Sequence, residues 1–359
     1  MLVQTHFPRK LTHSRYDQYL ASGWFRGSVM LYKMDLLCID ADVFSVVNIR
    51  LDLNGYALKK RHRKIKRQVE QKFSVTCGRA RVSADRQRLY EQHKSRFKGF
   101  IHATLDEYLH AGFQSTVFDT MEICVFDQDK LIAASYFDLG EKSMASLIGM
   151  YDTAYAEYSL GIYTMLREID FGLSSGRKYY YPGYVLDQPS AFDYKLSLGT
   201  MECYTPTKRW GKYANFNPKQ SLAFQLRESM IQLEQTLQTE GIPFRKWYYP
   251  YFSMGYMPLW QNRFLHMPLV FELGHDLDGI LIGGYCSETQ TFQLAHVHPC
   301  PDEQHFINME QATEFNDSSI YLSHLMEFGD VIAHCNLSEV IEFVHAWRIR
   351  PDTLPPSCN

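Results

Sequence analysis

Hydrophobic and polar residues alternate in several short segments of the chain, and this alternation predicts strands. The stretch FSVVNIRLDL at residues 44–53 has the pattern clearly. Three more β-type segments cover residues 121–126, 130–138 and 144–151, with the short sequences DQD and GEK between them. Segments of this length joined by short polar turns predict an antiparallel meander in the middle of the chain.

After the meander, the hydrophobic period changes to that of a helix. One face of the predicted helix carries four apolar residues: Ile162, Leu166, Ile169 and Leu173. Ser159 is in position to cap its start, and Gly176 to end it. The sequence KYYYPGY at residues 178–184 predicts a further strand, and a short helix is expected around residues 190–197.

The last part of the chain predicts a separate region with both helices and strands. A helix is expected after residue 218, and strands around residues 268–273, 279–286 and 290–297. The sequence NLSEVIEFVHAW at 336–347 then predicts a second helix. A length of 359 residues fits two or three domains with a sizeable core.

Charge is distributed very unevenly along the chain, although the formal net charge is only −3. Residues 1–110 hold 21 Lys and Arg against 10 Asp and Glu, whereas residues 111–359 hold 16 against 30. Seven cations fall within nine positions: Lys59, Lys60, Arg61, Arg63, Lys64, Lys66 and Arg67. Such a run predicts a helix that binds a polyanion, nucleic acid above all. The alternative is a basic helix that only faces solvent.

The cysteines and the hydrophobic runs indicate the cellular compartment of the protein. Eight cysteines are scattered without any CxxC pair, which is typical of reduced thiols rather than of a disulfide framework. No stretch approaches about 20 uninterrupted apolar residues, and the first 20 residues lack the pattern of a secretory signal. We therefore expect a cytoplasmic protein that does not bind membranes.

Several motifs together resemble the arginyl-tRNA–protein transferases. The most specific are SLGIYTMLREI at 159–169 and YYYPGYV at 179–185. Looser matches are LIAA at 131–134, MYD at 150–152, YK at 194–195 and GWFRGSVMLYK at 23–33. The resemblance covers roughly residues 15–210, and the basic run lies where that family has its own basic segment.

This resemblance implies an α/β (α+β) protein with a tandem GNAT-like acyltransferase fold. The expected domains are an N-terminal GNAT-like half at 1–115, a C-terminal GNAT-like aminoacyltransferase domain at 116–215, and an additional α/β region at 216–359. The implied activity transfers an amino acid, most often arginine, from charged tRNA to the α-amine of a protein or peptide. The basic run would then bind phosphates of the tRNA acceptor arm.

The resemblance also suggests which residues form the site. The backbone of the turn at 159–163 would position the aminoacyl ester, with these residues: Ser159, Leu160, Gly161, Ile162 and Tyr163. Asp152, next to Tyr151, would hold a cationic side chain or the incoming amine, or would only cap a turn. Tyr184, Tyr194 and Lys195 would shape or polarise the opposite wall, or would serve packing and phosphate contact. The energised ester needs mainly orientation, oxyanion donors and a proton acceptor.

The chain departs from the family in its N-terminal region. There the family has a CxxC-type cysteine cluster, and this chain has only Cys38. We therefore expect no metal, no iron–sulfur cluster and no cofactor besides aminoacyl-tRNA. Without this cluster, the family's usual preference for acceptors with an acidic N-terminal residue is not expected here. Two other functions stay open: an acyl-CoA-dependent acyltransferase, and a non-catalytic protein that binds tRNA or N-terminal peptides. Gly161 stands alone before Ile162, which disfavours a CoA pyrophosphate loop.

Overall fold

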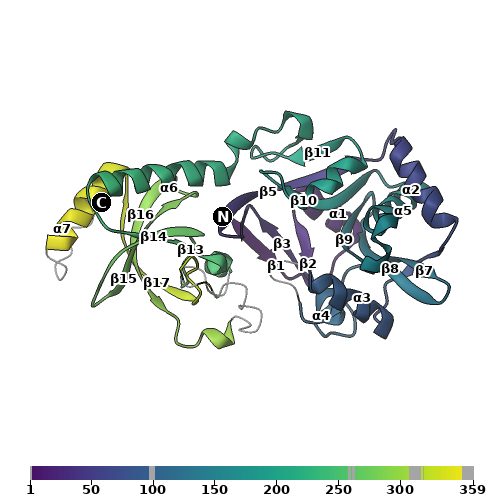
Figure 1. Cartoon of the computed structure of the whole chain (residues 1–359), viewed down its shortest axis with the longest axis horizontal. Helices are drawn as coiled ribbons and strands as arrows, with labels where there is room; N and C mark the ends of the chain where they lie inside the picture. The colour runs from purple at the N-terminus through teal and green to yellow at the C-terminus, as the bar shows by residue number, and fades with distance from the viewer. Residues whose placement is uncertain are drawn as a thin grey trace. The chain divides into compact units, whose positions relative to one another are not determined.

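The structure is a computed structural model, and it describes residues 2–96, 102–257, 260, 263–306, 317 and 319–349. The chain forms two compact units (Figure 1). One unit, here the central unit, contains residues 5–33 and 46–216, and the other, here the terminal unit, contains residues 1–4, 34–45 and 217–359. Both units combine helices with sheets, which confirms the α/β (α+β) class.

Each unit combines segments that are separated in the sequence. Residues on both sides of the expected division at 115/116 lie in the central unit. The second expected division, at 215/216, falls next to the start of the long segment of the terminal unit at residue 217. The terminal unit also takes residues 34–45 from within the N-terminal part of the sequence.

The central unit is built on a mixed sheet. Eight strands of this sheet follow one another in the order β12-β11-β5-β10-β9-β8-β7-β6. Their bounds, in chain order, are β5 Asp42–Asp52, β6 Ser74–Arg79, β7 Thr120–Asp127, β8 Lys130–Leu139, β9 Ser143–Tyr151, β10 Tyr179–Leu186, β11 Met201–Tyr204 and β12 Trp210–Lys212. The meander predicted from the sequence is confirmed as β7, β8 and β9, which pair antiparallel in succession.

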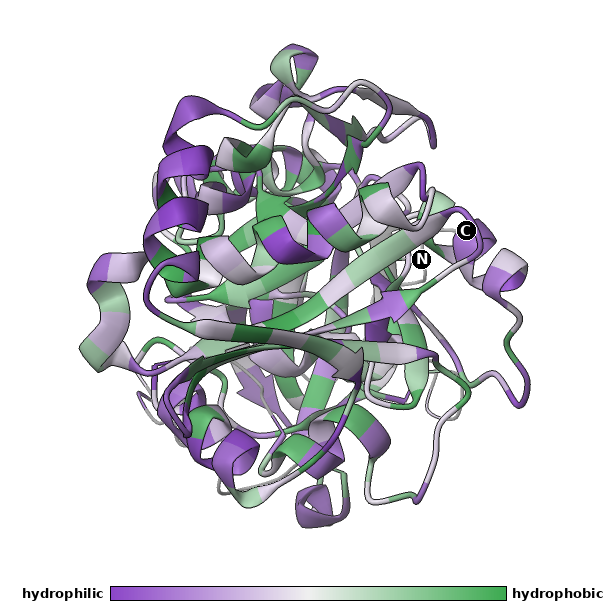
Figure 2. Ribbon diagram, turned by 90° about the vertical axis from the view of Figure 1, so that its right-hand side faces the viewer, coloured by the Kyte–Doolittle hydropathy of each residue, from purple (hydrophilic) through white to green (hydrophobic). Residues whose placement is uncertain are grey.

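Helices surround this sheet. They are α1 His13–Ala21, α2 Lys60–Glu70, α3 Ala84–Lys94, α4 Leu105–His110, the 3₁₀ turn η1 Thr153–Tyr158, α5 Leu160–Ser174 and the 3₁₀ turn η2 Asp193–Leu198. Leu166 and Ile169 of α5 are fully buried against sheet residues such as Phe137. Figure 2 shows hydrophobic residues along strands at the centre of the view and hydrophilic residues on surrounding helices. None of the described helices is long and apolar enough to cross a membrane.

Two details of α5 differ from the sequence prediction. Ser159 has a left-handed backbone, with φ of 53°, so its side chain makes no capping hydrogen bond. Leu173 is 42% exposed, because the buried face turns toward Thr164 and Glu168, which are both buried. The predicted end is confirmed, since Gly176 follows the helix with φ of 71°.

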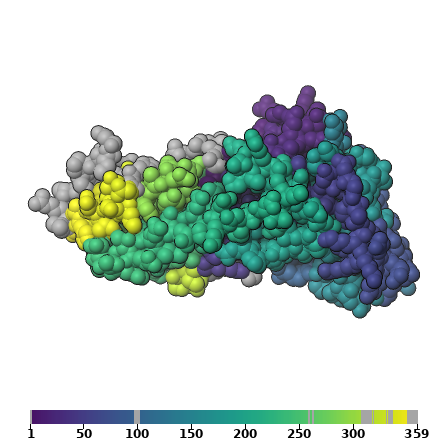
Figure 3. Space-filling view, turned by 90° about the horizontal axis from the view of Figure 1, so that it is seen from above, coloured from purple at the N-terminus to yellow at the C-terminus, as the bar shows by residue number. Residues whose placement is uncertain are grey.

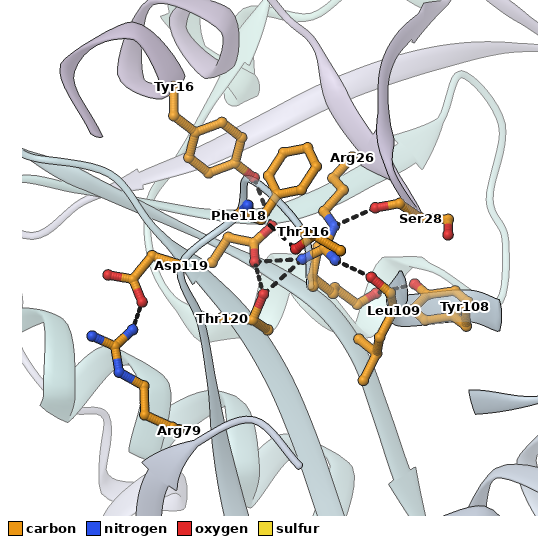
Figure 4. Close-up of polar contacts among 12 residues, drawn as sticks. Tyr16, Arg26, Ser28, Arg79, Tyr108, Leu109, Thr116, Phe118, Asp119 and Thr120 are labelled. Carbon is orange, nitrogen blue, oxygen red and sulfur yellow. Dashed lines mark hydrogen bonds and ion pairs between the residues drawn. The ribbon is translucent and has the colours of Figure 1, made fainter. Parts of the chain in front are cut away.

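A buried ion pair joins the N-terminal hairpin to the sheet of the central unit (Figure 4). The hairpin consists of β2 Phe25–Gly27 and β3 Met30–Met34. Arg26 of β2 donates to Asp138 of β8 at 2.7 Å and to the hydroxyl of Thr120 at 2.7 Å. Tyr16 of α1 donates to the second carboxylate oxygen of Asp138 at 3.2 Å. This network fixes the GWFRGS motif against β7 and β8.

The terminal unit has its own antiparallel sheet, in the order β13-β14-β15-β16-β17. The bounds are β13 Arg245–Tyr248, β14 Leu269–Asp276, β15 Gly279–Cys286, β16 Thr291–Pro299 and β17 Met326–Cys335. Helices α6 Leu222–Thr239 and α7 Leu337–Ile349 pack on this sheet and on each other. The predicted strands of this region correspond to β14, β15 and β16. Its core also takes Leu36 and Val43, which are fully buried.

Candidate active site

The candidate site lies where two neighbouring strands of the central sheet separate. β9 and β10 run parallel and pair only at their first residues, from Tyr179 with Ser143 to Tyr181 with Ala145. Beyond that point β9 stays paired with β8, up to Tyr151 opposite Ala133. β10 instead continues along β5. We call the region between residues 146–151 and 182–186 the β9–β10 opening.

Irregularities in both strands accompany this separation. In β9, Leu147 is skipped in the register with β8, because Ile148 pairs with Tyr136 and Ser146 with Phe137. In β10, the register with β5 shifts between Tyr180 and Gly183. Such bulges bend a strand and change the direction of its side chains. Gly183 has φ of 100°, a backbone conformation that favours glycine.

Lys195 of η2 lies beside this part of β10. Its amine donates to the backbone carbonyl oxygen of Tyr184 at 2.9 Å. The rings of Phe192, Tyr184 and Tyr194 surround the amine, with centroids 4.9, 5.2 and 5.9 Å from Nζ. The absence of a Cβ on Gly183 leaves room for the amine, since a Cβ there would lie 3.3 Å from Nζ.

The environment of Lys195 disfavours the charged form of its amine. The residue is only 9% exposed, and among the described residues no carboxylate forms an ion pair with it. Burial lowers the pKa of the Lys195 ammonium to about 7. A lysine in this state is an effective proton acceptor at neutral pH.

The three expected site tyrosines differ in their surroundings. The Tyr184 ring contacts Phe25 and Phe192, with centroid distances of 5.5 and 5.2 Å. Tyr194 is 48% exposed. At the end of β9, the backbone carbonyl oxygen of Tyr151 accepts a hydrogen bond from the Arg96 guanidinium at 3.3 Å, and this guanidinium lies 4.7 Å from the Tyr151 ring centroid.

Asp152 is bound to its own surroundings. One carboxylate oxygen accepts from the backbone N–H of Ala154 at 3.0 Å, which caps η1. The other lies 2.7 Å from the amine of Lys130. The Lys130 hydrogen bond is the main cause that lowers the pKa of Asp152. Asp152 is therefore a capping and ion-pairing residue, and its role in holding a substrate cation stays a prediction.

The turn at 159–163 forms the start of α5. Leu160 and Tyr163 are fully buried and pack against the apolar side of α2. Gly161 lies beside the Tyr151 ring, because a Cβ on it would be 3.7 Å from that ring. The N–H of Tyr163 bonds the carbonyl oxygen of Ser159 at 3.0 Å. The N–H groups of the first turn before it have no partner within the helix, so they are candidate donors to a ligand.

Helix α2 carries the basic run and has two distinct sides. His62, Ile65 and Val69 are buried, whereas five cations are exposed and make no ion pair within the described part of the chain: Lys60, Arg61, Arg63, Lys64 and Arg67. Figure 3 shows this segment in dark blue on the surface. The predicted helix is thus confirmed, and most of its positive charge is available to a ligand.

The basic helix is fixed to the elements that border the β9–β10 opening. The Lys59 amine donates to the carbonyl oxygen of Ser197 in η2 at 2.7 Å. Lys66 forms an ion pair with Asp170 of α5 at 2.5 Å. A shallow depression of about 320 Å³ follows the helix, lined by Leu58, Arg63, Lys66, Arg67, Glu70 and Gln71.

The sequence prediction missed Glu168 of α5, which is fully buried. The hydroxyl of Tyr180 donates to its carboxylate at 2.8 Å, and burial raises the pKa of Glu168 to about 7. The signal for this residue is its position four residues after Thr164 and eight after Leu160, on the helix face that meets the sheet. Glu168 lies near Tyr194, and its charge adds to the effect of burial, the larger cause, in raising the pKa of Tyr194.

In the terminal unit, acidic and histidine side chains meet at one end of the sheet. His296 and the indole N–H of Trp347 both bond the same oxygen of Asp276, at 2.8 and 2.9 Å. Asp276, Asp278 and His296 are close enough to hold a metal ion. The two hydrogen bonds to Asp276 also join the strands β14 and β16 to helix α7.

Comparisons with known proteins support the resemblance seen in the sequence. Residues 80–205 match the family model described as "Arginine-tRNA-protein transferase, C terminus". The chain is also similar to an aspartate/glutamate leucyltransferase from Leptospira interrogans, with 21% identity over 224 residues, covering 60% of this chain and 85% of that protein. The enzyme of the same name from Helicobacter hepaticus is 22% identical over 200 residues, covering 54% and 80%.

Similarities to solved structures are distant. The C-terminal domain of a putative lysylphosphatidylglycerol synthetase from Agrobacterium fabrum aligns with a TM-score of 0.31 and 11% identity, covering 39% of this chain and 47% of that one. A fungal GCN5-related glucosamine N-acetyltransferase region aligns with a TM-score of 0.28 and 15% identity, covering 55% and 23%. At these TM-scores the alignments define no shared geometry for the site.

Proposed function

We propose that this chain is an aminoacyl-tRNA-dependent transferase that moves an amino acid from charged tRNA to the α-amine of a protein or peptide. The matched segment 80–205 contains the β9–β10 opening, the turn at 159–163 and Lys195. The observation that carries the proposal is the attachment of the basic helix to η2 and α5. Five unpaired cations thereby lie beside the elements that border the candidate site.

The reaction makes limited demands on side chains. An aminoacyl ester is already energised, so binding the acceptor arm and orienting the ester against a neutral amine supply much of the acceleration. Cations of α2 bind backbone phosphates, and N–H donors at the start of α5 stabilise the oxyanion that forms on the ester carbonyl oxygen. The exposed face of α2 suits phosphates because its cations have no carboxylate partner among the described residues.

Arginine and leucine are the two candidates for the transferred amino acid. The description of the matching family model favours arginine, which is also the expectation from the sequence motifs. The names of the relatives favour leucine, and they favour acceptors that begin with Asp or Glu. Asp152, the expected partner of an arginyl side chain, already has Lys130 as its cation, which supports leucine.

The test uses the full chain with tRNA carrying labelled leucine or arginine, and with tRNA charged with each of the other amino acids. Peptides that begin with Asp, Glu or Ala are the acceptors, and mass spectrometry detects a gain of one residue. We expect transfer to at least one peptide from one charged tRNA. Acetyl-CoA in place of tRNA is the control. No transfer from any aminoacyl-tRNA, or transfer of acetyl alone, would refute the proposal.

A further inference from the structure

Lys195 differs from the other buried cations of the central unit. Among the described residues, three lysines and arginines are buried: Arg26, Arg50 and Lys195. Arg26 is paired with Asp138 at 2.7 Å, and Arg50 with Glu202 at 2.7 Å. Lys195 has one backbone carbonyl and three aromatic rings around its amine, and no ion pair with a carboxylate in the described part of the chain. A buried ammonium without an anion is costly, so this site favours the neutral amine.

The rings and the carbonyl oxygen around Lys195 attract an ammonium, but the cost of burying the charge outweighs this attraction. The titratable groups that face it are Tyr194 of its own element and Tyr184 of β10. Glu168 of α5 bonds Tyr180, and burial is the one cause that shifts the pKa of Lys195. A neutral amine that donates one hydrogen to the Tyr184 carbonyl retains a lone pair, which is available to a proton.

Asp152, the carboxylate that follows β9, is a poor base. Its carboxylate is engaged by Lys130 and by the N–H of Ala154, and its pKa is lowered. A base works best when its pKa lies close to that of the group it deprotonates and to the working pH. The α-amine of a peptide has a pKa of about 7.7–8.0, which is near the value for Lys195 and far from that of a paired carboxylate.

We propose that Lys195 accepts the proton released by the acceptor's α-amine during transfer, an inference that rests on the proposed function. The amine nitrogen forms a bond to the ester carbon, and the carbonyl electron pair moves to its oxygen. The resulting ammonium passes one proton to Nζ of Lys195. As the carbonyl reforms, the bond from carbon to the ribose oxygen breaks. The ribose oxygen leaves with that electron pair and takes the proton back from Lys195, so the amine is restored.

The test compares Lys195→Arg and Lys195→Met with the wild type in single-turnover transfer between pH 5.5 and 9. The acceptor is a peptide whose α-amine is acidified by an electron-withdrawing neighbour, so that it stays neutral over this range. Lys178→Arg, on an exposed lysine just before β10, is the matched control. The guanidinium of Lys195→Arg stays charged and cannot accept a proton, but it keeps a donor for the Tyr184 carbonyl.

We expect the wild-type rate to rise with pH through a midpoint near 7, the value for Lys195. Both Lys195 variants should lose this limb and about 10²–10⁴-fold in rate, with little change in tRNA affinity. A Lys195→Arg enzyme with the wild-type rate and limb would overturn the proposal in favour of a positioning or oxyanion role. A wild type that transfers nothing from any aminoacyl-tRNA would instead refute the proposed function.

A second measurement covers variants that fail to fold. NMR of the wild-type protein labelled with ¹³C at the lysine ε-carbons follows each amine through its titration. We expect one lysine signal to titrate near pH 7. If no lysine signal titrated between pH 5.5 and 9, the proposal would be overturned, because the Lys195 amine would then stay protonated throughout the working range.

Discussion

At the scale of single residues, the buried pair Arg26–Asp138 gives the clearest stability prediction. The Arg26 and Asp138 side chains are 2% and 0% exposed, and burial alone would raise the pKa of Asp138. Replacing Arg26 with Met leaves a buried carboxylate without its cation, so we expect a loss of about 3–5 kcal/mol in the free energy of unfolding. Urea denaturation measures it. The double variant Arg26→Met with Asp138→Asn should recover part of the loss, and no recovery would contradict the ion-pair explanation.

Glu168 gives a prediction about pH at the same scale. Its pKa is about 7 in the folded protein, against 4.5 for an ordinary glutamate. Between these values the folded state binds the proton more tightly than the unfolded chain, so stability falls as pH rises from about 4.5 to about 7. The contribution is roughly 3 kcal/mol in total. Urea titrations of Glu168→Gln at several pH values should lack this fall, and an unchanged pH profile would show that Glu168 is ionised when folded.

At the scale of elements, the prediction concerns helix α2. Changing its five unpaired cations, Lys60, Arg61, Arg63, Lys64 and Arg67, to Ala should weaken tRNA binding and reduce the dependence of affinity on salt. Five exposed cations elsewhere form the matched control: Arg9, Lys10, Lys208, Arg209 and Lys212. Filter binding at several salt concentrations gives both slopes. Equal slopes for the α2 variant and the wild type would mean that α2 only faces solvent.

The elements also show which structural features can be predicted from the sequence and which cannot. The bounds of β7, β8 and β9 follow closely from local periodicity, which depends only on neighbouring residues, and the same kind of pattern predicts that α2 is a helix. The β9–β10 opening does not, because it depends on register shifts at Leu147 and before Gly183 that arise from pairing with other strands. For the same reason, the sequence indicates Lys195 as a candidate but not its aromatic surroundings. Asp152 is a similar case: the sequence does not reveal that its carboxylate is already paired with Lys130, which only the structure shows.

At the scale of the whole molecule, the terminal unit is built from separate segments of the chain, so it cannot be removed by ending the chain at residue 216. Leu36 and Val43, far from residue 217 in sequence, are fully buried in the same core as Ala223, Leu226 and Met230. A chain that ends at residue 216 therefore exposes both side chains together with the rest of the 34–45 segment. Because exposed apolar surface of this kind drives association, we expect such a chain to unfold at lower temperature and to aggregate.

Two further chains make this prediction specific. The shortened chain with Leu36→Thr and Val43→Thr should aggregate less than the shortened chain alone, as light scattering during heating would measure. In the full chain the same two changes should instead reduce stability, since each removes buried apolar groups from the core. If the shortened chain proved as soluble and as stable as the full one, residues 34–45 would have to find other contacts within the central unit. The terminal unit would then be an independent addition, and activity of the shortened chain would show that residues 217–359 are not needed for transfer.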